Sequence, residues 1–437
     1  MRIPLDYGET GLDLALPPAA EERTTVIRPR FPAPVTSEEE AIVRALRAPD
    51  AGPPLAERVP EGATVAISVC DPTRAQPRVP MLRAILEEIP TPPERVTLLV
   101  ATGTHRPATP AELEAMFGRE LLAACEVVNH RCGDASELVR LPDTEHGVPV
   151  LLNRRFLEAD VRITTGFVEP HFFAGFSGGP KMVAPGLAGM ETILVLHDEA
   201  RIGHPSAVFG ITEGNPVHDD VRAIARQVDV DFGLDVLLDG DKRITGVFGG
   251  DLLDEHALAC VRSHEEAMCP VDQPFEVVVA TNSGYPLDQN LYQAVKGMSA
   301  AERIVGTGGA ILCAAECRDG IPDEGAYARA LRAGGTLAEV RATLAAAPVR
   351  RPDDWQIQVH CRILERASVG LHSSLAEETV RAAHLEPVAD LSLACREALG
   401  AAGEGARLAV LPPGPITRTN LRRGASQGVR PRKIHMR

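Results

Sequence analysis

The sequence predicts an α/β fold made of two α/β domains with mostly parallel sheets. Two observations favour this class. In the first half of the chain, apolar β-branched runs alternate with helical patterns, and from about residue 274 the same alternation begins again. Such alternation is typical of parallel sheets, because two parallel strands are joined by a crossover that is usually a helix. The length of 437 residues is sufficient for two or three domains.

The predicted N-terminal domain spans residues 1–265. A helix is expected to begin at Pro110, because Thr109 and Glu112 have the spacing of a capping box and proline is favoured at the first helical position. The other elements expected here are strands at 64–71, 95–105, 125–130 and 160–168 and a helix at 79–89.

The predicted C-terminal domain spans residues 273–420, and the stretch 255–272 is expected to cross between the two domains. The basic, apolar-poor segment 421–437 is expected to be a disordered tail. The elements expected in this domain are strands at 274–284, 308–317 and 407–414 and helices at 287–302 and around 325–347.

The composition restricts the class of partner. Lys and Arg number 45 against 60 Asp and Glu, and the resulting charge of -15 disfavours nucleic acid and anionic membranes. No apolar run approaches the roughly 18 residues of a membrane span, and the N-terminus does not have the pattern of a secretory signal. Nine scattered cysteines without CxxC spacing are typical of reduced thiols. We therefore expect a cytoplasmic protein that binds neither nucleic acid nor membrane.

Reactive side chains follow three of the predicted strands. Arg74 belongs to the segment DPTR after the first strand, and His105 belongs to ATGTHRP after the second. His171 follows the third strand, and a glycine-rich segment then leads to Lys181. Because ligands of open α/β sheets bind at the carboxyl ends of the strands, these residues are expected to converge.

Each of these residues has an ordinary structural explanation when it is taken alone. DPTR can be a turn with a surface arginine, and a single histidine after a strand is usually a hydrogen-bonding residue. The segment GFSGGPK lacks the spacing of a P-loop. The convergence of two histidines, an arginine and a lysine on one sheet favours a functional site over four unrelated residues.

Two further positions have both a plain and a functional interpretation. His197 lies near the end of an apolar helical stretch, where a core histidine is the default and a metal ligand the alternative. In the second domain, Tyr292 and Gln293 share helix faces with Lys296. They are expected to form either a polar helix surface or an anion clamp that closes over the first domain's site.

Together and in order, these segments resemble the lactate racemase family over most of the chain. The matching segments are DPTR, ATGTHRP, GFVEPHFFAGFSGGPKMVAPGLAG, His197 and YPLDQNLYQAVKGM. The resemblance implies a racemase or epimerase that inverts C2 of a 2-hydroxy acid in a cleft between two domains. Substrates in the family range from lactate to larger hydroxy acids and sugar acids, and the matching residues do not distinguish among them.

The resemblance also implies a cofactor, a nickel-pincer nucleotide. This is a pyridinium-3-thioamide-5-thiocarboxylic acid mononucleotide that binds nickel through carbon and sulfur, and separate biosynthetic proteins supply it. Lys181 would be its covalent tether, and His197 would be a nickel ligand. Pro180, directly before the tether, departs from the family's pattern. The positions expected to contact the cofactor are Asp71, Thr73, Ser177, Gly178, Gly179, Tyr292 and Trp355, the three loop residues through a phosphate-binding backbone.

On the matching positions, His105 and His171 would be paired acid/base residues. Arg74 and Lys296 would hold the substrate carboxylate or hydroxyl, with help from Gln293. Removal of a hydride from C2 gives a planar 2-keto acid, and its return to the other face inverts the centre. The hydroxyl proton must leave as the hydride does, so a base on each face lets either enantiomer react. The cofactor would carry the hydride chemistry, while the protein supplies geometry and charge.

Two alternatives remain open. An oxidoreductase with a dissociable nicotinamide would share the hydride chemistry, but no GxGxxG segment follows the first predicted strand. A non-catalytic or divergent family member would bind a small carboxylate or the cofactor without turnover. The pair of His105 and His171 argues against such a binder, because binding alone does not need acid/base groups on two sides.

Overall fold

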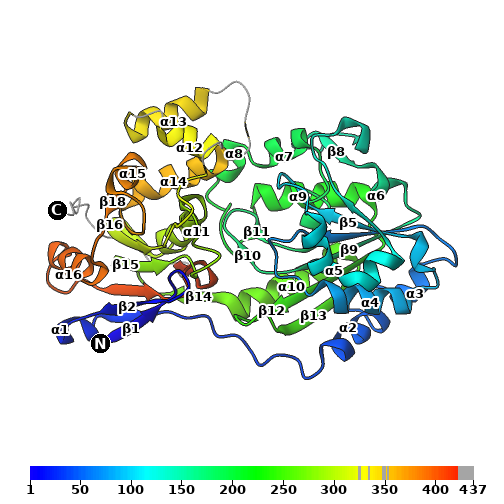
Figure 1. Ribbon diagram of the computed structural model, residues 1–437, viewed down its shortest axis with the longest axis horizontal. Coiled ribbons are helices and arrows are strands. Elements are labelled where there is room, and N and C mark those ends of the chain that lie inside the picture. The colour runs from blue at the N-terminus through cyan, green and yellow to red at the C-terminus, as the bar shows by residue number, and fades with distance from the viewer. Residues whose placement is uncertain (323–325, 333–334, 347–350, 352–353, 422–437) are drawn as a thin grey trace. The chain divides into compact units, whose positions relative to one another are not determined.

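The chain divides into two compact units in the computed structural model (Figure 1). Unit 1 comprises Met1–Arg30 and Ala267–Arg437, and unit 2 comprises Phe31–Glu266. The junction falls inside the stretch that was expected to cross between the domains. The structure describes residues 1–322, 326–332, 335–346, 351 and 354–421. Except for Leu421, the predicted tail lies outside these residues.

The first thirty residues differ from the prediction that residues 1–265 form one domain, since they pack in unit 1. Strand β3 (Thr24–Val26) adds in parallel to β19 (Leu408–Leu411) at the edge of the unit 1 sheet. The hairpin of β1 (Arg2–Leu5) and β2 (Leu12–Ala15) places its apolar side chains in the same core. The pairing partner of β3 lies almost 400 residues away in the sequence, and local patterns carry no information on such a contact.

Unit 2 contains a six-stranded sheet with the order β13-β12-β9-β4-β5-β6. Neighbouring strands are parallel except for β12 and β13, which are antiparallel. All six residues of β4 are buried, as expected for the centre of a sheet covered on both faces. The strands are β4 (Val65–Cys70), β5 (Val96–Ala101), β6 (Glu126–Asn129), β9 (Val161–Phe167), β12 (Phe232–Leu238) and β13 (Ile244–Gly250).

Helices cover both faces of this sheet. Ile67 and Val69 of β4 pack with α2, α4 and α5, whereas Ala66 faces the layer that contains α6, α7 and α9. The capping box predicted for α5 is confirmed, with both of its hydrogen bonds formed. The helices are α2 (Glu38–Arg47), α3 (Leu55–Arg58), α4 (Arg78–Glu88), α5 (Pro110–Ala124), α6 (Arg154–Glu158), α7 (Met190–Leu196), α8 (Glu199–Ile202), α9 (Pro216–Val228) and α10 (Leu252–Ala267).

Two short antiparallel pairs complete unit 2. The first consists of β7 (Leu138–Leu141) and β8 (Val150–Asn153). The second consists of β10 (Pro170–His171) and β11 (Gly175–Phe176), and it directly follows the carboxyl end of β9. This second pair gives the chain around His171 a defined conformation, where the sequence suggests only a loop.

Unit 1 contains a six-stranded, entirely parallel sheet with the order β18-β17-β16-β15-β19-β3. Helix α16 and the N-terminal hairpin pack against the side chains of one face. The remaining strands of unit 1 are β14 (Met268–Val271), β15 (Phe275–Thr281), β16 (Val305–Ala314), β17 (Ser368–His372), β18 (Glu386–Pro387) and β20 (Arg418–Leu421). The helices are α1 (Pro18–Glu21), α11 (Leu291–Glu302), α12 (Ala326–Arg332), α13 (Leu337–Ala346), α14 (Asp354–Arg366), α15 (Glu377–Ala382) and α16 (Leu391–Ala402).

The mixed α/β architecture with mostly parallel sheets is therefore confirmed in both units. All nine cysteines are free thiols. None of the helices in the described part of the chain is long and apolar enough to cross a membrane.

Candidate active site

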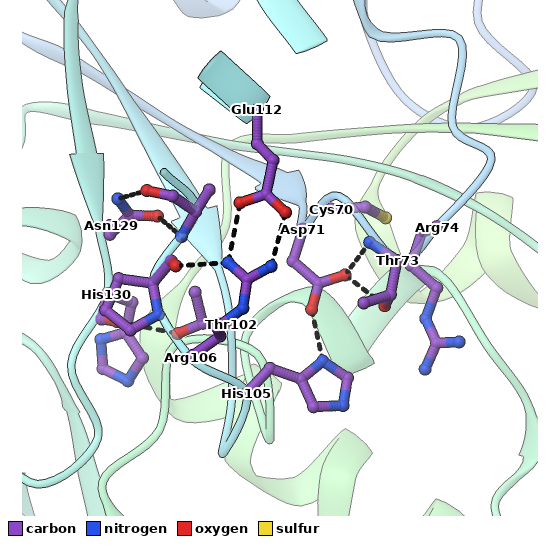
Figure 2. Close-up of polar contacts among 12 residues, drawn as sticks. Cys70, Asp71, Thr73, Arg74, Thr102, His105, Arg106, Glu112, Asn129 and His130 are labelled. Carbon is purple, nitrogen blue, oxygen red and sulfur yellow. Dashed lines mark hydrogen bonds and ion pairs between the residues drawn. The ribbon is translucent and has the colours of Figure 1, made fainter. Parts of the chain in front are cut away.

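Asp71 and His105 form a well-defined polar pair in unit 2. Asp71 follows β4 with a side chain that is 4% exposed, whereas His105 follows β5 and is 49% exposed. Oδ2 of Asp71 is hydrogen-bonded to Nδ1 of His105. Oδ1 accepts hydrogen bonds from the Thr73 amide at 3.1 Å and the Thr73 hydroxyl at 2.6 Å. Figure 2 shows the Asp71 carboxylate between Thr73 and the His105 ring.

This pair determines which nitrogen of His105 can act as a base. Burial alone would raise the pKa of Asp71, but the hydrogen bonds from His105 and Thr73 and the charge of Arg74 lower it below its ordinary value. An ionised Asp71 accepts the Nδ1 proton, so a neutral His105 carries its lone pair on Nε2. The carboxylate thus orients the imidazole as it does in hydrolytic triads.

Two buried side chains anchor the loop that carries Arg74. Oε1 of Gln76 accepts the Cys70 amide at 2.8 Å, and its Nε2 donates to the Thr165 hydroxyl at 2.8 Å. The Arg78 guanidinium donates to the carbonyl oxygens of Cys70 at 2.9 Å and Arg74 at 3.0 Å. The sequence did not identify Gln76 or Arg78, because a polar residue beside a proline gives no indication of burial.

The glycine-rich loop places Lys181 in a short 3-10 helix, η3 (Gly179–Met182). Gly178 and Gly179 have φ values of 72° and 47°, in the left-handed region that favours glycine. A Cβ atom on Gly178 would lie 2.9 Å from the Phe167 carbonyl oxygen, and one on Gly179 would lie 2.3 Å from the His256 ring. Both glycines are therefore required by backbone conformation and by close packing.

The backbone amides of this loop are partly engaged inside the protein. The Ser177 amide donates to the Glu169 carbonyl oxygen at 2.8 Å, and the Gly179 amide donates to Oδ2 of Asp235 at 2.7 Å. A phosphate contact through these two amides, which the sequence suggests, is therefore not prepared in this structure. The Ser177 hydroxyl donates to the Phe167 carbonyl oxygen at 2.9 Å and so stabilises the start of the loop.

The Lys181 amine lies in an environment that disfavours its charge. Burial lowers its pKa to about 7, and the charge of Arg74 lowers it further, against the opposing charge of Glu169. Nζ lies 5.9 Å from the centre of the Phe173 ring. An amine with such a pKa is substantially neutral near pH 7, and the neutral form is the nucleophile that a covalent tether requires.

Phe173 brings three of the predicted site residues together. Besides the Lys181 amine, its ring contacts His171, with centroids 4.5 Å apart, and His197, with centroids 5.1 Å apart. Both histidines meet it edge to face. The predicted tether, the predicted metal ligand and one predicted acid/base residue thus surround a single aromatic side chain that the sequence did not single out.

His171 has a second aromatic neighbour and a defined ring orientation. Its ring stacks on Phe172 with centroids 4.8 Å apart. Its Nδ1 accepts the amide hydrogen of Ala174 at 3.3 Å. In the neutral ring the proton then resides on Nε2, which differs from His105, where Nδ1 carries the proton. One histidine is thus arranged to donate at Nε2 and the other to accept there.

His197 is the residue that follows α7, and one nitrogen of its ring is engaged by the backbone of that helix. Its Nδ1 donates to the Ile193 carbonyl oxygen at 2.8 Å, an arrangement that directs the lone pair to Nε2. Burial lowers its pKa to about 4, and the charge of Lys181 adds to this effect while the Ile193 hydrogen bond opposes it. The ring is therefore neutral near pH 7, as metal coordination requires.

The remaining predicted residues lie in unit 1. Within Leu291–Ala300 of α11, only Tyr292, Gln293 and Lys296 are partly exposed, and the other positions are buried. The backbone amide of Gln293 donates to Oδ1 of the N-cap residue Asn290 at 3.0 Å. The shared helix face that the sequence predicts is therefore present.

Trp355 lies at the start of α14, next to α11. The neighbouring Gln356 donates from Nε2 to the Tyr292 carbonyl oxygen at 2.6 Å, which joins the two helices. The Tyr292 ring meets the buried Tyr327 ring at a centroid distance of 5.5 Å, and the Tyr327 hydroxyl is 3.0 Å from Nδ1 of His360. Whether these side chains close over the site of unit 2 stays a prediction.

In unit 2, Arg74 and His105 follow β4 and β5, and His171 and Lys181 follow β9. The family models for the lactate racemase N-terminal and C-terminal domains match residues 7–210 and 271–416. The lactate racemase of Lactiplantibacillus plantarum is 35% identical over 86% of this chain and 90% of its own length. That of Thermoanaerobacterium thermosaccharolyticum is 33% identical over 86% of this chain and 89% of its own length.

Solved structures agree with the sequence comparisons. The lactate racemase apoprotein from Thermoanaerobacterium thermosaccharolyticum matches with a TM-score of 0.89 at 32% identity, covering 97% of this chain and all of that one. A protein from Thermotoga maritima, at 20% identity and a TM-score of 0.66, shares the fold. The chain belongs to the lactate racemase family, a family of isomerases, and this family implies a nickel-dependent cofactor.

The residues present fit such a cofactor. Lys181 offers an amine of lowered pKa, and His197 offers a neutral imidazole with its lone pair on Nε2. Both side chains contact the Phe173 ring. A neutral amine and a neutral imidazole placed in this way fit a group that contains a metal and is attached to a lysine.

Proposed function

We propose that this protein is a racemase or epimerase that inverts C2 of a 2-hydroxy acid with a nickel-pincer nucleotide tethered to Lys181. The observation that carries the proposal is the arrangement around Phe173, where Lys181, His171 and His197 meet. The orientation of His105 by Asp71 supports the same conclusion. When bound, the cofactor would accept a hydride from C2 and return it.

The protein's own residues would manage the protons and the charge of the substrate. His105, with its lone pair on Nε2, would take the hydroxyl proton from one face, and His171 would serve the opposite face. Their opposite protonation patterns suit one turnover, because one must accept a proton as the other gives one. Arg74, with Lys296 and Gln293, would hold the carboxylate and fix the orientation of C2. Asp71 and Thr73 would contact the cofactor, and Tyr292 and Trp355 would line the site.

The experiment that tests the proposal follows a deuterium label at C2. The protein would be produced together with cofactor-synthesis enzymes, and C2-deuterated L- and D-lactate, a larger aliphatic hydroxy acid and a sugar acid would each be supplied in ordinary water. Chiral chromatography with mass spectrometry would measure both configuration and label. We expect inversion with retention of deuterium, because a hydride that stays on the enzyme does not exchange with water.

Two outcomes would contradict the proposal. Inversion with loss of the label would indicate removal of a proton from C2 and would exclude hydride transfer. The absence of inversion for every hydroxy acid, from protein shown to carry the cofactor, would favour the non-catalytic alternative.

A further inference from the structure

Two carboxyl groups are buried side by side behind the loop that carries Lys181. Asp235 lies on β12, where it pairs with Gly166 of β9, and it is 2% exposed. Glu255 lies on α10 and is 0% exposed. The sequence indicated neither of them. Asp235 lies within an apolar strand pattern, and Glu255 lies in a polar segment of a helix.

Both groups hold a proton more strongly than an ordinary carboxyl group does. Burial raises the pKa of Asp235 to about 7, and burial together with the charge of Asp235 raises the pKa of Glu255 well above its usual range. As a carboxylate, Glu255 would find no donor among the described residues for either buried oxygen. As a carboxylic acid it donates a hydrogen bond to Asp235, which lowers the Asp235 pKa and raises its own.

Asp235 in turn holds the lysine loop. Its Oδ2 accepts the Gly179 amide at 2.7 Å, two residues before Lys181. A Cβ atom on Gly178 would lie 3.0 Å from the same oxygen, and one on Gly166 would lie 2.6 Å from Oδ1. The loop and the adjacent strand therefore pack directly on this carboxyl group, and glycine is needed wherever they do so.

His256, which follows Glu255 on α10, contacts the same loop at the preceding peptide unit. Nε2 of His256 donates to the Ser177 carbonyl oxygen at 2.9 Å. Burial lowers the pKa of His256 to about 3, so the ring is neutral and its single N–H makes this bond. The loop is thus fixed at two successive peptide positions, by an acceptor for Gly179 and a donor for Ser177.

We infer that Asp235 and Glu255 are positioning residues, which fix the Gly179 amide and thereby keep the Lys181 amine in its buried place beside Phe173. Burying two carboxyl groups costs free energy that an apolar pair would not cost, which favours a positional role over a contribution to core stability. The use of the amine as a tether rests on the proposed function. The positioning itself is a property of the unloaded protein and can be measured there.

The experiment measures the pH dependence of Lys181 acetylation by a trace of acetic anhydride in unloaded protein, by peptide mass spectrometry. The chain has four lysines, at 181, 242, 296 and 433, so each is followed separately. We expect a midpoint near pH 7 for the wild type. Asp235→Leu combined with Glu255→Met removes the acceptor and its donor while keeping similar shapes. In this variant the midpoint should rise by about one unit or more, because a released loop lets the amine reach water.

Two variants separate positioning from a general loss of structure. Asp235→Asn retains an oxygen acceptor for Gly179 and should keep the Lys181 midpoint near the wild-type value. Asp288 of unit 1 is a matched control, since it is 0% exposed and its Oδ2 accepts the Gly8 amide, also at 2.7 Å. Asp288→Leu should leave the Lys181 midpoint unchanged.

An unchanged Lys181 midpoint in the folded double variant would overturn the inference, as would an equal shift in Asp288→Leu. If the double variant does not fold, amide hydrogen exchange of the wild type decides, because Gly179 should exchange as slowly as the amides of β12. Rapid exchange at Gly179 would overturn the inference. None of these readouts depends on the cofactor, so their failure is distinguishable from failure of the proposed function.

Discussion

The hydrogen bond between Oδ2 of Asp71 and Nδ1 of His105 joins a side chain that is 4% exposed to one that is 49% exposed. The buried carboxylate is additionally held by the amide and the hydroxyl of Thr73. The exposed imidazole therefore has a fixed tautomer although water can reach it. This relationship gives the most direct prediction about catalysis.

Asp71→Asn should lower kcat of the loaded protein by roughly 10²- to 10⁴-fold, because the amide can donate to Nδ1 and so move the His105 proton to Nε2. Initial rates of racemisation would measure the effect. Thr73→Val is the matched control, since it removes the hydroxyl and leaves the Asp71–His105 bond intact. Its kcat should fall less than about tenfold. A fully active Asp71→Asn would show that the tautomer of His105 is not important.

His105→Ala and His171→Ala should each abolish racemisation, with a loss of at least roughly 10²-fold, while both variants still acquire the cofactor. Each variant should still convert one enantiomer, a different one in each case, to the 2-keto acid in a single turnover. Rapid quenching with chiral analysis would detect this. His264→Ala, on the exposed face of α10, is the control. Racemisation by either active-site variant at the control's rate would exclude a two-base mechanism.

Lys181→Met should raise the free energy of unfolding by roughly 2–4 kcal/mol below pH 7, allowing for the partial exposure of Lys181. The pKa is about 7 in the folded protein against 10.5 for an ordinary lysine, so the unfolded chain binds more protons between these values. The charge of Lys181 is thus fully unfavourable below pH 7, and this penalty fades as the pH rises to 10.5.

Denaturant unfolding of the unloaded protein at pH 6.5 and pH 10 would measure the change for Lys181→Met. Lys242→Met, at an exposed lysine, is the control and should show no pH-dependent gain. Equal effects of the two substitutions at both pH values would contradict the buried environment that the structure gives Lys181.

Gly178→Ala should destabilise unit 2 and prevent loading. Alanine at φ 72° has a strained backbone, and its Cβ would also lie 2.8 Å from Val168 and 2.9 Å from the Phe167 carbonyl oxygen. Gly147→Ala is the matched control, with φ 74° and nothing within 4 Å of the added carbon. It should cost only about 1–2 kcal/mol of backbone strain. Thermal unfolding and intact mass would compare them, and equal losses would show that packing of the loop is not the cause.

Much of the fold was predictable, because it depends on local patterns. Buried strands such as β4 (Val65–Cys70) are mainly apolar, and the capping box before Pro110 marks a helix start by spacing alone. The place of β3 was not predictable, since its pairing with β19 is decided by the shape of a core assembled from distant segments.

The chemistry of the site was only partly predictable. His105, His171 and Lys181 follow strand ends and are visible in the sequence, but what orients them is not. Asp235, for example, lies within an apolar strand, and only the three-dimensional packing of Gly179 on its carboxyl group reveals what it does.

The measurement that tests the central claim most directly is intact-protein mass spectrometry with nickel analysis, on protein produced together with the cofactor-synthesis enzymes. Lys181→Ala would be measured in parallel. The account predicts a mass increase localised to Lys181, about one nickel per chain, and neither in Lys181→Ala. An unmodified wild-type mass without nickel, under conditions that load a known lactate racemase, would contradict the account, as would a fully loaded Lys181→Ala.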